Sequence, residues 1–327
     1  MLYPIKFIPR LKERLWGGTE LLSRVKQGKG AKIDPTKPYG ESWDLSSVAG
    51  DESVVANGYL KRNTIEEIVE VYMGNLVGEK NYDRYGLTFP LLIKSLECCD
   101  TLSVQVHPDD EAARRRGYRR GKTEMWYIMP SVADAKLYCG FRHDMTEQEY
   151  RRRVAEGTLC EALRQYGVAE GDAFFLPTGR VHAIGAGCML AEVQQASDVT
   201  YRMHDYGRRD KDGRERQLHV DEAAEVTQWS TSGDERIRKA PQAGRGVELA
   251  GCDYFCVVRY DVEGDAVPLA EAAADSFVIL IGVAGEGTVT AGNGREPLRC
   301  GESLLVAAEC TDIRVEGRVS LLAVYVP

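Results

Sequence analysis

The chain has 327 residues, enough for one large or two medium domains, and 43% of them are hydrophobic, which is ample for a packed core. Its 42 Lys and Arg against 50 Asp and Glu leave a formal charge of −8, which argues against a nucleic-acid or anionic-membrane surface but not against a small anionic substrate. No apolar run is long enough to span a bilayer, and the first residues do not form a signal-peptide pattern.

The cysteines indicate the redox compartment. Nine of them are scattered along the chain, several inside apolar stretches, and none forms a Cys-x-x-Cys pair. Disulfide frameworks use even numbers of cysteines and belong to secreted domains. We therefore expect reduced, buried thiols and a cytoplasmic protein.

The first half of the chain is predicted to mix strands with a few helices. Residues 1–60 have the turn signals and the alternation of short strands, and residues 89–96 are an apolar strand. Helical spacing of apolar residues, or an acidic start with a basic end, predicts helices over 63–80, 109–121 and 145–166.

Polar residues mark where two of these helices begin. Asn63 or Thr64 can cap the helix over 63–80. Thr146 followed by Glu149 has the spacing of a capping box, so the last helix is expected to start there.

The composition changes after residue 230. Residues 231–246 are rich in Ser, Gly, Asp and Arg without periodicity and are predicted to be a linker. Residues 247–327 carry only strand signals separated by Gly-rich turns, as in a β-sandwich or barrel. We predict a metal-binding domain over 1–230 with helical insertions, followed by the linker and a second β domain.

Two polar residues stand on one face of an otherwise apolar strand. Gln105 and His107 are two positions apart, so their side chains point to the same side, while Val104 and Val106 point to the core. Pro108 ends the strand directly after the histidine. A rigid strand with an amide and an imidazole on one face can hold two metal ligands.

A second stretch carries another histidine at a fixed spacing. Residues 171–182 follow the pattern Gly-x5-Pro-x-Gly-x2-His, in which a strand and a tight turn lead to His182. This spacing resembles the second motif of the cupins, which are jelly-roll barrels that carry a metal inside. The resemblance implies a closed barrel with His182 on its inner wall.

Residues 121–129 predict a further strand, on which Glu124 and Trp126 share one face. The candidate donors are then Gln105, His107, Glu124 and His182. Two imidazoles, a carboxylate and an amide oxygen suit Zn²⁺, with Fe²⁺, Mn²⁺ or Co²⁺ as alternatives. Only one of these donors is charged, so a bound metal would keep a net positive charge and act as a Lewis acid.

Six stretches together resemble the type I mannose-6-phosphate isomerases (phosphomannose isomerases) in their short bacterial form. These stretches are Gly-Glu-Ser-Trp at 40–43, Phe-Pro-Leu-Leu-Ile-Lys at 89–94, Leu-Ser-Val-Gln-Val-His-Pro at 102–108, Lys-Thr-Glu-Met-Trp at 122–126, Pro-Thr-Gly-Arg-Val-His-Ala at 177–183 and Glu-Val-Gln-Gln-Ala-Ser-Asp-Val-Thr-Tyr-Arg at 192–202. The resemblance covers about residues 1–220. It implies a mainly β protein built of two cupin-type jelly-roll barrels with a few added helices.

The resemblance also implies a site and a reaction. The family's zinc ligands match the same four donors, which implies one Zn²⁺ per chain, and the family's active-site arginine matches Arg202. Lys94, Lys122 and Asp198 fall on positions that are similar to the family's other candidate site residues. The implied reaction interconverts D-mannose 6-phosphate and D-fructose 6-phosphate through a cis-enediol.

Side-chain chemistry limits the role that each residue can take. Arg202 stays protonated, so we assign it to charge stabilisation and substrate positioning. The base stays open among Asp198, Lys122, His204 and a zinc-bound water. As phosphate contacts we name three residues, each with a structural role as the alternative: Lys94, Ser42 and Arg180.

The C-terminal region contains a weakened copy of the second motif. Residues 301–312 align with 171–182, but Ala307 replaces the proline and Asp312 replaces the histidine. We predict a cupin-like barrel that has lost its metal and packs against the first.

Two other functions stay open from the sequence. One is a non-catalytic cupin that binds or senses a sugar phosphate, and the other is a cupin Fe(II) oxygenase, which uses two histidines and one carboxylate. Arg202 and the set of four donors favour the isomerase. The expected partner is a small sugar phosphate, with no nucleic acid, membrane or obligate protein partner evident.

Overall fold

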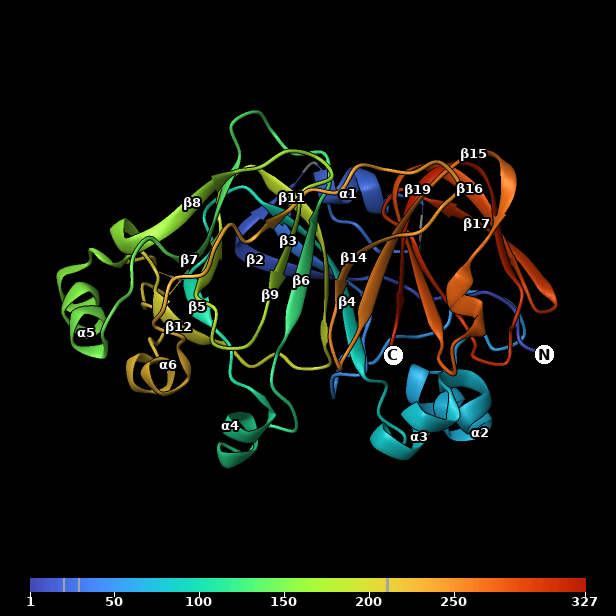
Figure 1. The fold of residues 1–327 in the computed structure, drawn as a ribbon, viewed down its shortest axis with the longest axis horizontal. Coiled ribbons are helices and arrows are strands. Elements are labelled where there is room, and N and C mark those ends of the chain that lie inside the picture. Colours follow the sequence, from blue (N-terminus) through green and yellow to red (C-terminus); the bar gives the residue numbers. More distant parts are fainter. Residues whose placement is uncertain (20, 29, 210–211) are drawn as a thin grey trace.

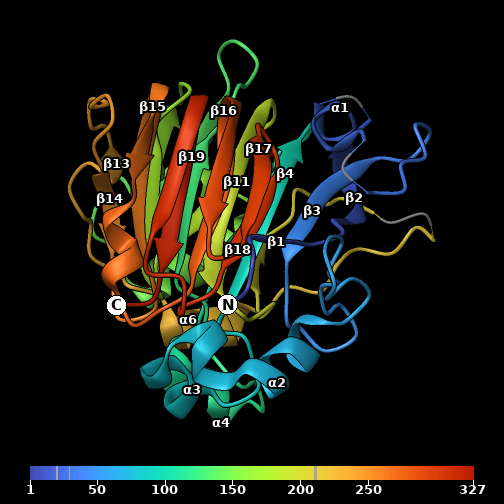
Figure 2. The ribbon, with the colours of Figure 1, turned by 90° about the vertical axis from the view of Figure 1, so that its right-hand side faces the viewer.

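The computed structural model describes residues 1–19, 21–28, 30–209 and 212–327. Strands make up 40% and helices 17% of it, which confirms a mainly β protein. Three antiparallel sheets pack face to face as layers that follow one another along the long axis of the molecule (Figures 1 and 2). Within the described chain, no helix is both long and apolar enough to cross a membrane.

The central sheet has seven strands and runs through the middle of the molecule. In spatial order they are β13 (Arg236–Ile237), β9 (Ala173–Leu176), β6 (Glu124–Ile128), β11 (Cys188–Gln195), β4 (Leu91–Cys98), β3 (Tyr39–Leu45) and β2 (Arg10–Gly18). Every residue of β4, β6 and β11 is buried, because other layers cover both faces of this sheet.

The outer sheet has five strands and faces one side of the central sheet. It consists of β12 (Tyr201–His204), β5 (Val104–Val106), β10 (His182–Ile184), β7 (Lys136–Phe141) and β8 (Leu163–Gly167). Trp126 and Leu190 of the central sheet share one core with Leu137 and Ile184 of this sheet. Helices α5 (Glu147–Glu156) and α6 (Val220–Val226) cover its other face, beside a second core around Val104 and Val106.

The C-terminal sheet packs on the opposite face of the central sheet. It consists of β1 (Ile5–Lys6), β18 (Ser303–Val306), β16 (Val278–Ala291), β19 (Ile313–Tyr325), β15 (Cys256–Pro268) and β14 (Val247–Gly251), with β17 (Gly294–Arg299) paired to β16. Met125 and Val193 of the central sheet join Ile279 and Leu321 in the largest core of the protein. Figure 2 shows this sheet in front of the central one.

The closed barrel that the second motif implied is not formed: among the described residues the hydrogen bonds of the sheets do not close, and the sheets stack as sandwiches. The first strand, β1, belongs to the C-terminal sheet, because Ile5 and Lys6 pair with Leu305 and Leu304 of β18. The start of the chain is therefore bound into the C-terminal sheet. The division into 1–230, 231–246 and 247–327 stays a prediction, and within 231–246 the short strand β13 pairs with β9.

The remaining helices are short and lie at the edges of the sheets. They are α1 (Leu21–Lys26), α2 (Ile65–Val77), α3 (Glu79–Tyr85), α4 (Asp110–Arg115) and the 3₁₀ turns η1 (Leu159–Ala162) and η2 (Ala270–Ala273). Thr64 caps α2 with a complete capping box, because its hydroxyl accepts from Glu67 N while the Glu67 carboxylate accepts from Thr64 N. Thr146 likewise caps α5 by accepting from Glu149 N.

The predicted helix over 145–166 is wrong in its second half. Gly157 takes a left-handed conformation that ends α5, and Leu163–Gly167 is strand β8, paired with β7. The helical spacing of apolar residues continues past Gly157, but the open edge of β7 offers backbone partners that a helix would leave unused.

Candidate active site

Three buried side chains from three strand ends converge between the central and outer sheets. His107 directly follows β5, Glu124 opens β6 and His182 opens β10. His182 Nε2 lies 3.2 Å from Glu124 Oε1, and His107 Nε2 lies 3.5 Å from Glu124 Oε2. One potential ligand atom from each lies within 4.8 Å of the other two, an arrangement that could hold a metal ion.

Backbone carbonyl groups fix the orientation of both imidazoles. His107 Nδ1 lies 2.8 Å from Val199 O and His182 Nδ1 lies 2.8 Å from Arg180 O. A proton on Nδ1 that is donated to the carbonyl leaves the lone pair of Nε2 directed at Glu124. Burial lowers the pKa of His182 to about 3 and that of His107 well below its usual value. Both rings are therefore neutral, as metal ligands must be.

The carboxylate between the two rings lacks a full set of donors. Glu124 Oε1 is buried and has no hydrogen-bond donor among the described residues. Burial raises the pKa of Glu124 to about 7, although Lys122 acts in the opposite direction. A buried carboxylate oxygen without a donor is costly unless a cation compensates it. These residues therefore fit a divalent cation.

Gln105, the fourth predicted donor, lies at the same cluster. It is the direct partner of His182 across the β5–β10 pair, and its amide lies 3.2 Å from His182 Nε2. Its position agrees with the predicted role, and its part in binding a metal stays a prediction.

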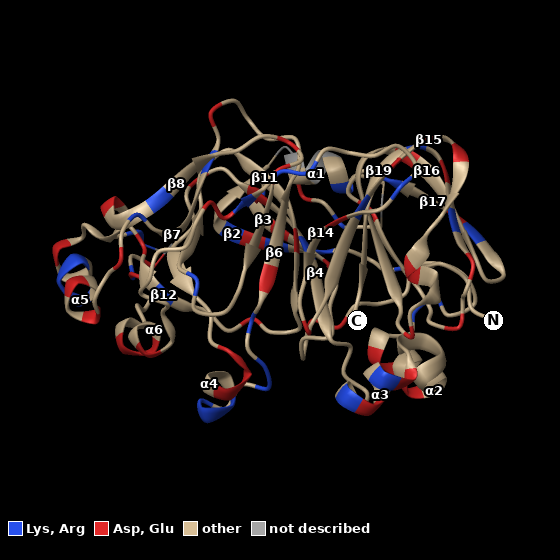
Figure 3. Cartoon of the chain, in the orientation of Figure 1, with Lys and Arg blue, Asp and Glu red and all other residues tan. Residues whose placement is uncertain are grey.

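A cavity of about 400 Å³ opens beside this cluster. Lysines, arginines and carboxylates line most of it, with a few apolar side chains: Lys12, Arg14, Trp16, Glu41, Trp43, Asp51, Lys94, Leu96, Leu102, Ser103, Gln105, Lys122, Ile184, Glu192, Asp198, Thr200, Arg202 and Arg216. Six of these are cationic and four are acidic. Acidic and basic residues are mixed over the rest of the chain (Figure 3), so this local excess of positive charge stands out in an acidic protein.

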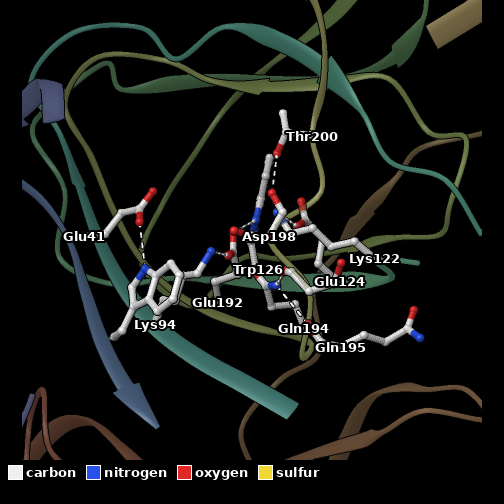
Figure 4. Close-up of polar contacts among 12 residues, drawn as sticks. Glu41, Lys94, Lys122, Glu124, Trp126, Glu192, Gln194, Gln195, Asp198 and Thr200 are labelled. Carbon is white, nitrogen blue, oxygen red and sulfur yellow. Dashed lines mark hydrogen bonds and ion pairs between the residues drawn. The ribbon is translucent and has the colours of Figure 1, made fainter. Parts of the chain in front are cut away.

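A buried ion pair forms one wall of the cavity. Lys94 Nζ lies 3.0 Å from Glu192 Oε1, and the Trp126 indole N–H donates to the same carboxylate at 3.0 Å (Figure 4). Burial alone would raise the pKa of Glu192, but Lys94 and Lys122 outweigh it and lower the pKa to about 2. The sequence interpretation gave Glu192 no role. A charged residue inside the apolar run of β11 was the signal that could have identified it.

Lys122 links this wall to the candidate metal-binding cluster of His107, Glu124 and His182. Its Nζ lies 2.9 Å from Glu124 Oε2 and 3.2 Å from His107 Nε2. Burial would lower the pKa of Lys122, but Glu124 and Glu192 outweigh it and raise the pKa above its usual value. Asp198 is exposed and lies on the cavity surface.

Arg202 lies on β12, directly opposite Gln105. Its Nη1 donates to Gln217 O at 2.9 Å, and its buried Nε has no hydrogen-bond partner among the described residues. Burial, together with the positive charge of Arg216, lowers its pKa from the usual value for arginine. Arg216 and Arg208 share the carboxylate of Asp205, and Arg208 also pairs with Asp100 at 3.5 Å. Together with Arg202 these groups leave more positive than negative charge at this corner of the cavity.

Three predicted residues do not reach the cavity. Ser42 lies on the other face of β3 and donates to Asp44 at 2.6 Å, while its neighbours Glu41 and Trp43 line the cavity. Arg180 is paired with Glu235 at 2.7 Å. His204 packs edge-on against Tyr206, with ring centroids 4.9 Å apart.

Two family models match the chain. The model of the phosphomannose isomerase type I catalytic domain matches residues 5–166, and that of the mannose-6-phosphate isomerase cupin domain matches residues 247–326. The second match confirms the predicted cupin fold, in the sandwich form described above.

Proteins similar over their whole length carry the same family name. Mannose-6-phosphate isomerase ManA of Bacillus subtilis is 35% identical over 96% of both chains. Mannose-6-phosphate isomerase of Streptococcus mutans is 31% identical over 99% of this chain and 98% of that one. The crystal structure of the mannose 6-phosphate isomerase from Bacillus subtilis superimposes with a TM-score of 0.82 at 28% identity, covering 99% of each chain. The chain therefore belongs to the type I phosphomannose isomerases and is an isomerase of that family.

Proposed function

We propose that this enzyme interconverts D-mannose 6-phosphate and D-fructose 6-phosphate with one Zn²⁺, through a cis-enediol. The observation that carries the proposal is the buried His107–Glu124–His182 cluster beside a cavity with excess positive charge. Gln105 is the proposed fourth ligand. When bound, zinc would supply a Lewis acid for the oxygens on C1 and C2 of the sugar.

The chain's own residues would move the proton and hold the charge. Asp198 offers a carboxylate on the cavity surface, which would take the proton from C2 of mannose 6-phosphate and return it to C1. Arg202 would stabilise the negative charge that develops on the oxygen, because no carboxylate among the described residues pairs with it. Lys122 would donate a hydrogen bond to the same oxygen from inside the cavity.

The phosphate needs a cationic subsite away from the reacting carbons. Lys94 lines the cavity and stays a proposed contact, although Glu192 already balances its charge. Arg216 adds a stronger argument, because Asp205 is the one carboxylate among the described residues that pairs with it, and Asp205 also pairs with Arg208. The positions of Ser42 and Arg180 outside the cavity lessen the case for them.

The test is isomerisation of mannose 6-phosphate to fructose 6-phosphate by the purified protein. A chelator should remove the activity and added zinc should restore it. Turnover that survives complete removal of metal would contradict the proposal. Turnover restored by another divalent metal but not by zinc would leave the reaction standing and change the metal.

We also propose that the enzyme is cytoplasmic and that it acts on its sugar phosphate without an obligate protein partner. The buried thiols of Cys98, Cys139, Cys188, Cys256 and Cys310 support a reducing compartment. Cell fractionation would test it, since a secreted form would contradict it.

A further inference from the structure

Gln194 is a fully buried glutamine beside the candidate metal centre. It lies on β11, directly opposite Glu124 on β6, and its side chain points to the same side of the central sheet as Glu192 and Trp126. We propose that Gln194 is a positioning residue, which orders the loop 196–200 between β11 and β12 and through it orients His107 and Asp198. This inference rests on the proposed function, since it assumes a metal at the His107–Glu124–His182 cluster.

The first step is the contact between Gln194 and the loop. Its amide Nε2 donates to Gln195 O at 2.9 Å and also to Ser197 O, while its Oε1 has no donor among the described residues (Figure 4). The two carbonyl groups fix which end of the amide is nitrogen. An apolar side chain in this place would leave Ser197 O, in a buried residue, without that donor.

The second step leads from the loop to the metal ligand. Two residues after Ser197, the Val199 carbonyl is the group that holds His107 Nδ1 at 2.8 Å. This contact selects the tautomer and sets the ring rotation that directs Nε2 at Glu124. The loop also carries Asp198 into the cavity. A displaced loop would therefore disturb one ligand and the proposed base together.

The third step shows why the effect should be local. Gln195 ties the start of the loop to Thr123, the residue directly before Glu124: Thr123 N donates to Gln195 Oε1 at 2.8 Å and Gln195 N donates to Thr123 O at 3.1 Å. His182 takes its orientation from Arg180 O, outside the loop. Loss of the Gln194 amide should therefore loosen His107 and leave the strands and His182 in place.

The experiment replaces Gln194 with a side chain of similar length that cannot donate. The control is Asn81→Leu, because Asn81 is also buried and its amide also donates to a backbone carbonyl, Val77 O at 2.8 Å, far from the site. Zinc affinity of wild type, Gln194→Met and Asn81→Leu is measured by competition with a chelator, and the unfolding of the metal-free proteins is measured in parallel. We expect Gln194→Met to bind zinc about 10–100-fold more weakly than wild type, and Asn81→Leu to bind it normally.

Isomerisation kinetics at saturating zinc then separate positioning from simple loss of metal. We expect a lower kcat with little change in KM for Gln194→Met, because Asp198 is displaced while the cationic subsite is kept. Zinc affinity within about twofold of wild type would overturn the proposal, and so would an equal loss in the Asn81→Leu control. If Gln194→Met does not fold, Gln194→Asn, with its amide one methylene shorter, is judged by the same affinity criterion. Zinc affinity is measured without substrate, so a wild-type protein that binds zinc but does not isomerise would contradict only the proposed function.

Discussion

The two halves of the chain use the same local structure for different ends. Strand β9 occupies the third to sixth positions of the stretch 171–182, and β18 occupies the same positions of the stretch 301–312. Each stretch opens on a glycine with positive φ, 90° at Gly171 and 75° at Gly301, which other residues rarely adopt. The correspondence of strand and turn supports the predicted repeat.

The repeats differ at the position that ends them. His182 is buried beside Glu124, whereas Asp312 is exposed and pairs with Arg314 at 3.0 Å. Residues 247–327 contain no histidine at all. The same strand-and-turn backbone can thus surround a polar site or an apolar core. A few side chains decide which of the two it surrounds.

The same contrast extends to the way that the interiors are stabilised. The C-terminal sheet buries rows of Val, Ile and Leu, while the site side of the central sheet buries Lys94, Glu192, Lys122 and Glu124. Buried charges cost free energy unless each is paired. The site therefore depends on neighbours that hold its charges, and the predictions below test this difference.

The largest expected effect comes from alanine substitution at one of the two equivalent positions, 182 and 312. His182→Ala should remove the bound metal and the isomerase activity, because it deletes a ligand that Glu124 alone cannot replace. Asp312→Ala should leave both unchanged. Metal content and turnover of the two purified variants check this, and a metal-free Asp312→Ala protein would break the comparison.

Arg202→Ala is expected to separate binding of the metal from turnover. The arginine is not one of the potential metal ligands His107, Glu124 and His182, so metal content should stay at the wild-type level. Losing the donor to a developing oxyanion should lower kcat about 10²–10³-fold. Arg314→Ala in the other half is the matched control, and full turnover by Arg202→Ala would remove Arg202 from the mechanism.

A third variant tests a buried contact that joins the two halves. Lys26 Nζ donates to both oxygens of Asp44, at 2.6 and 2.7 Å, and to Gly301 O at 2.7 Å. Lys26→Met would leave the Asp44 carboxylate buried without its cation, which should cost about 3–5 kcal/mol of unfolding free energy. Urea unfolding measures this. The double variant Lys26→Met/Asp44→Leu should recover part of the loss, and no recovery would show that the charge of Asp44 is not the cause.

The smallest expected effect is a pH-dependent one at Asp205. Burial would raise the pKa of this carboxyl, but hydrogen bonds from Arg216 and Arg208 outweigh it and lower the pKa. A lowered pKa in the folded state adds stability above the unfolded value of about 3.9, and this stability is lost as the pH falls through the folded pKa. Asp205→Asn should thus be less stable than wild type at pH 7, and the difference should shrink below about pH 4. An equal difference at pH 7 and pH 3 would contradict the assignment.

The sequence was informative wherever alternation or fixed spacing decides the geometry. Gln105 and His107 were predicted to leave a strand on one face, and they meet His182 because β5 and β10 are neighbours. Phosphate contacts were harder, since a matching stretch does not say which of its alternating residues faces inward. Glu41 and Trp43 line the cavity, while Ser42 between them faces Asp44.

Long-range pairing was the other part that local patterns could not give. Nothing within Leu163–Gly167 marks it as a partner of β7, and helical spacing continues into it from α5. The contacts of Glu192 with Lys94 and Trp126 also come from three separate strands. Such contacts depend on the order of strands in the sheets, which the sequence alone did not provide.

The pairing of β1 with β18 bears on the order in which the chain can fold during synthesis. Leu2 N donates to the side chain of Glu309, 307 positions along the sequence, next to the strand pair that encloses the C-terminal sheet. Ile5 and Lys6 must therefore wait until Leu304 and Leu305 have been synthesised before β1 can pair with β18. Contacts over such a separation form late and slowly. Until then the edge of β1 is open to other nascent chains, so chaperone protection of this strand would matter most before β18 has been made.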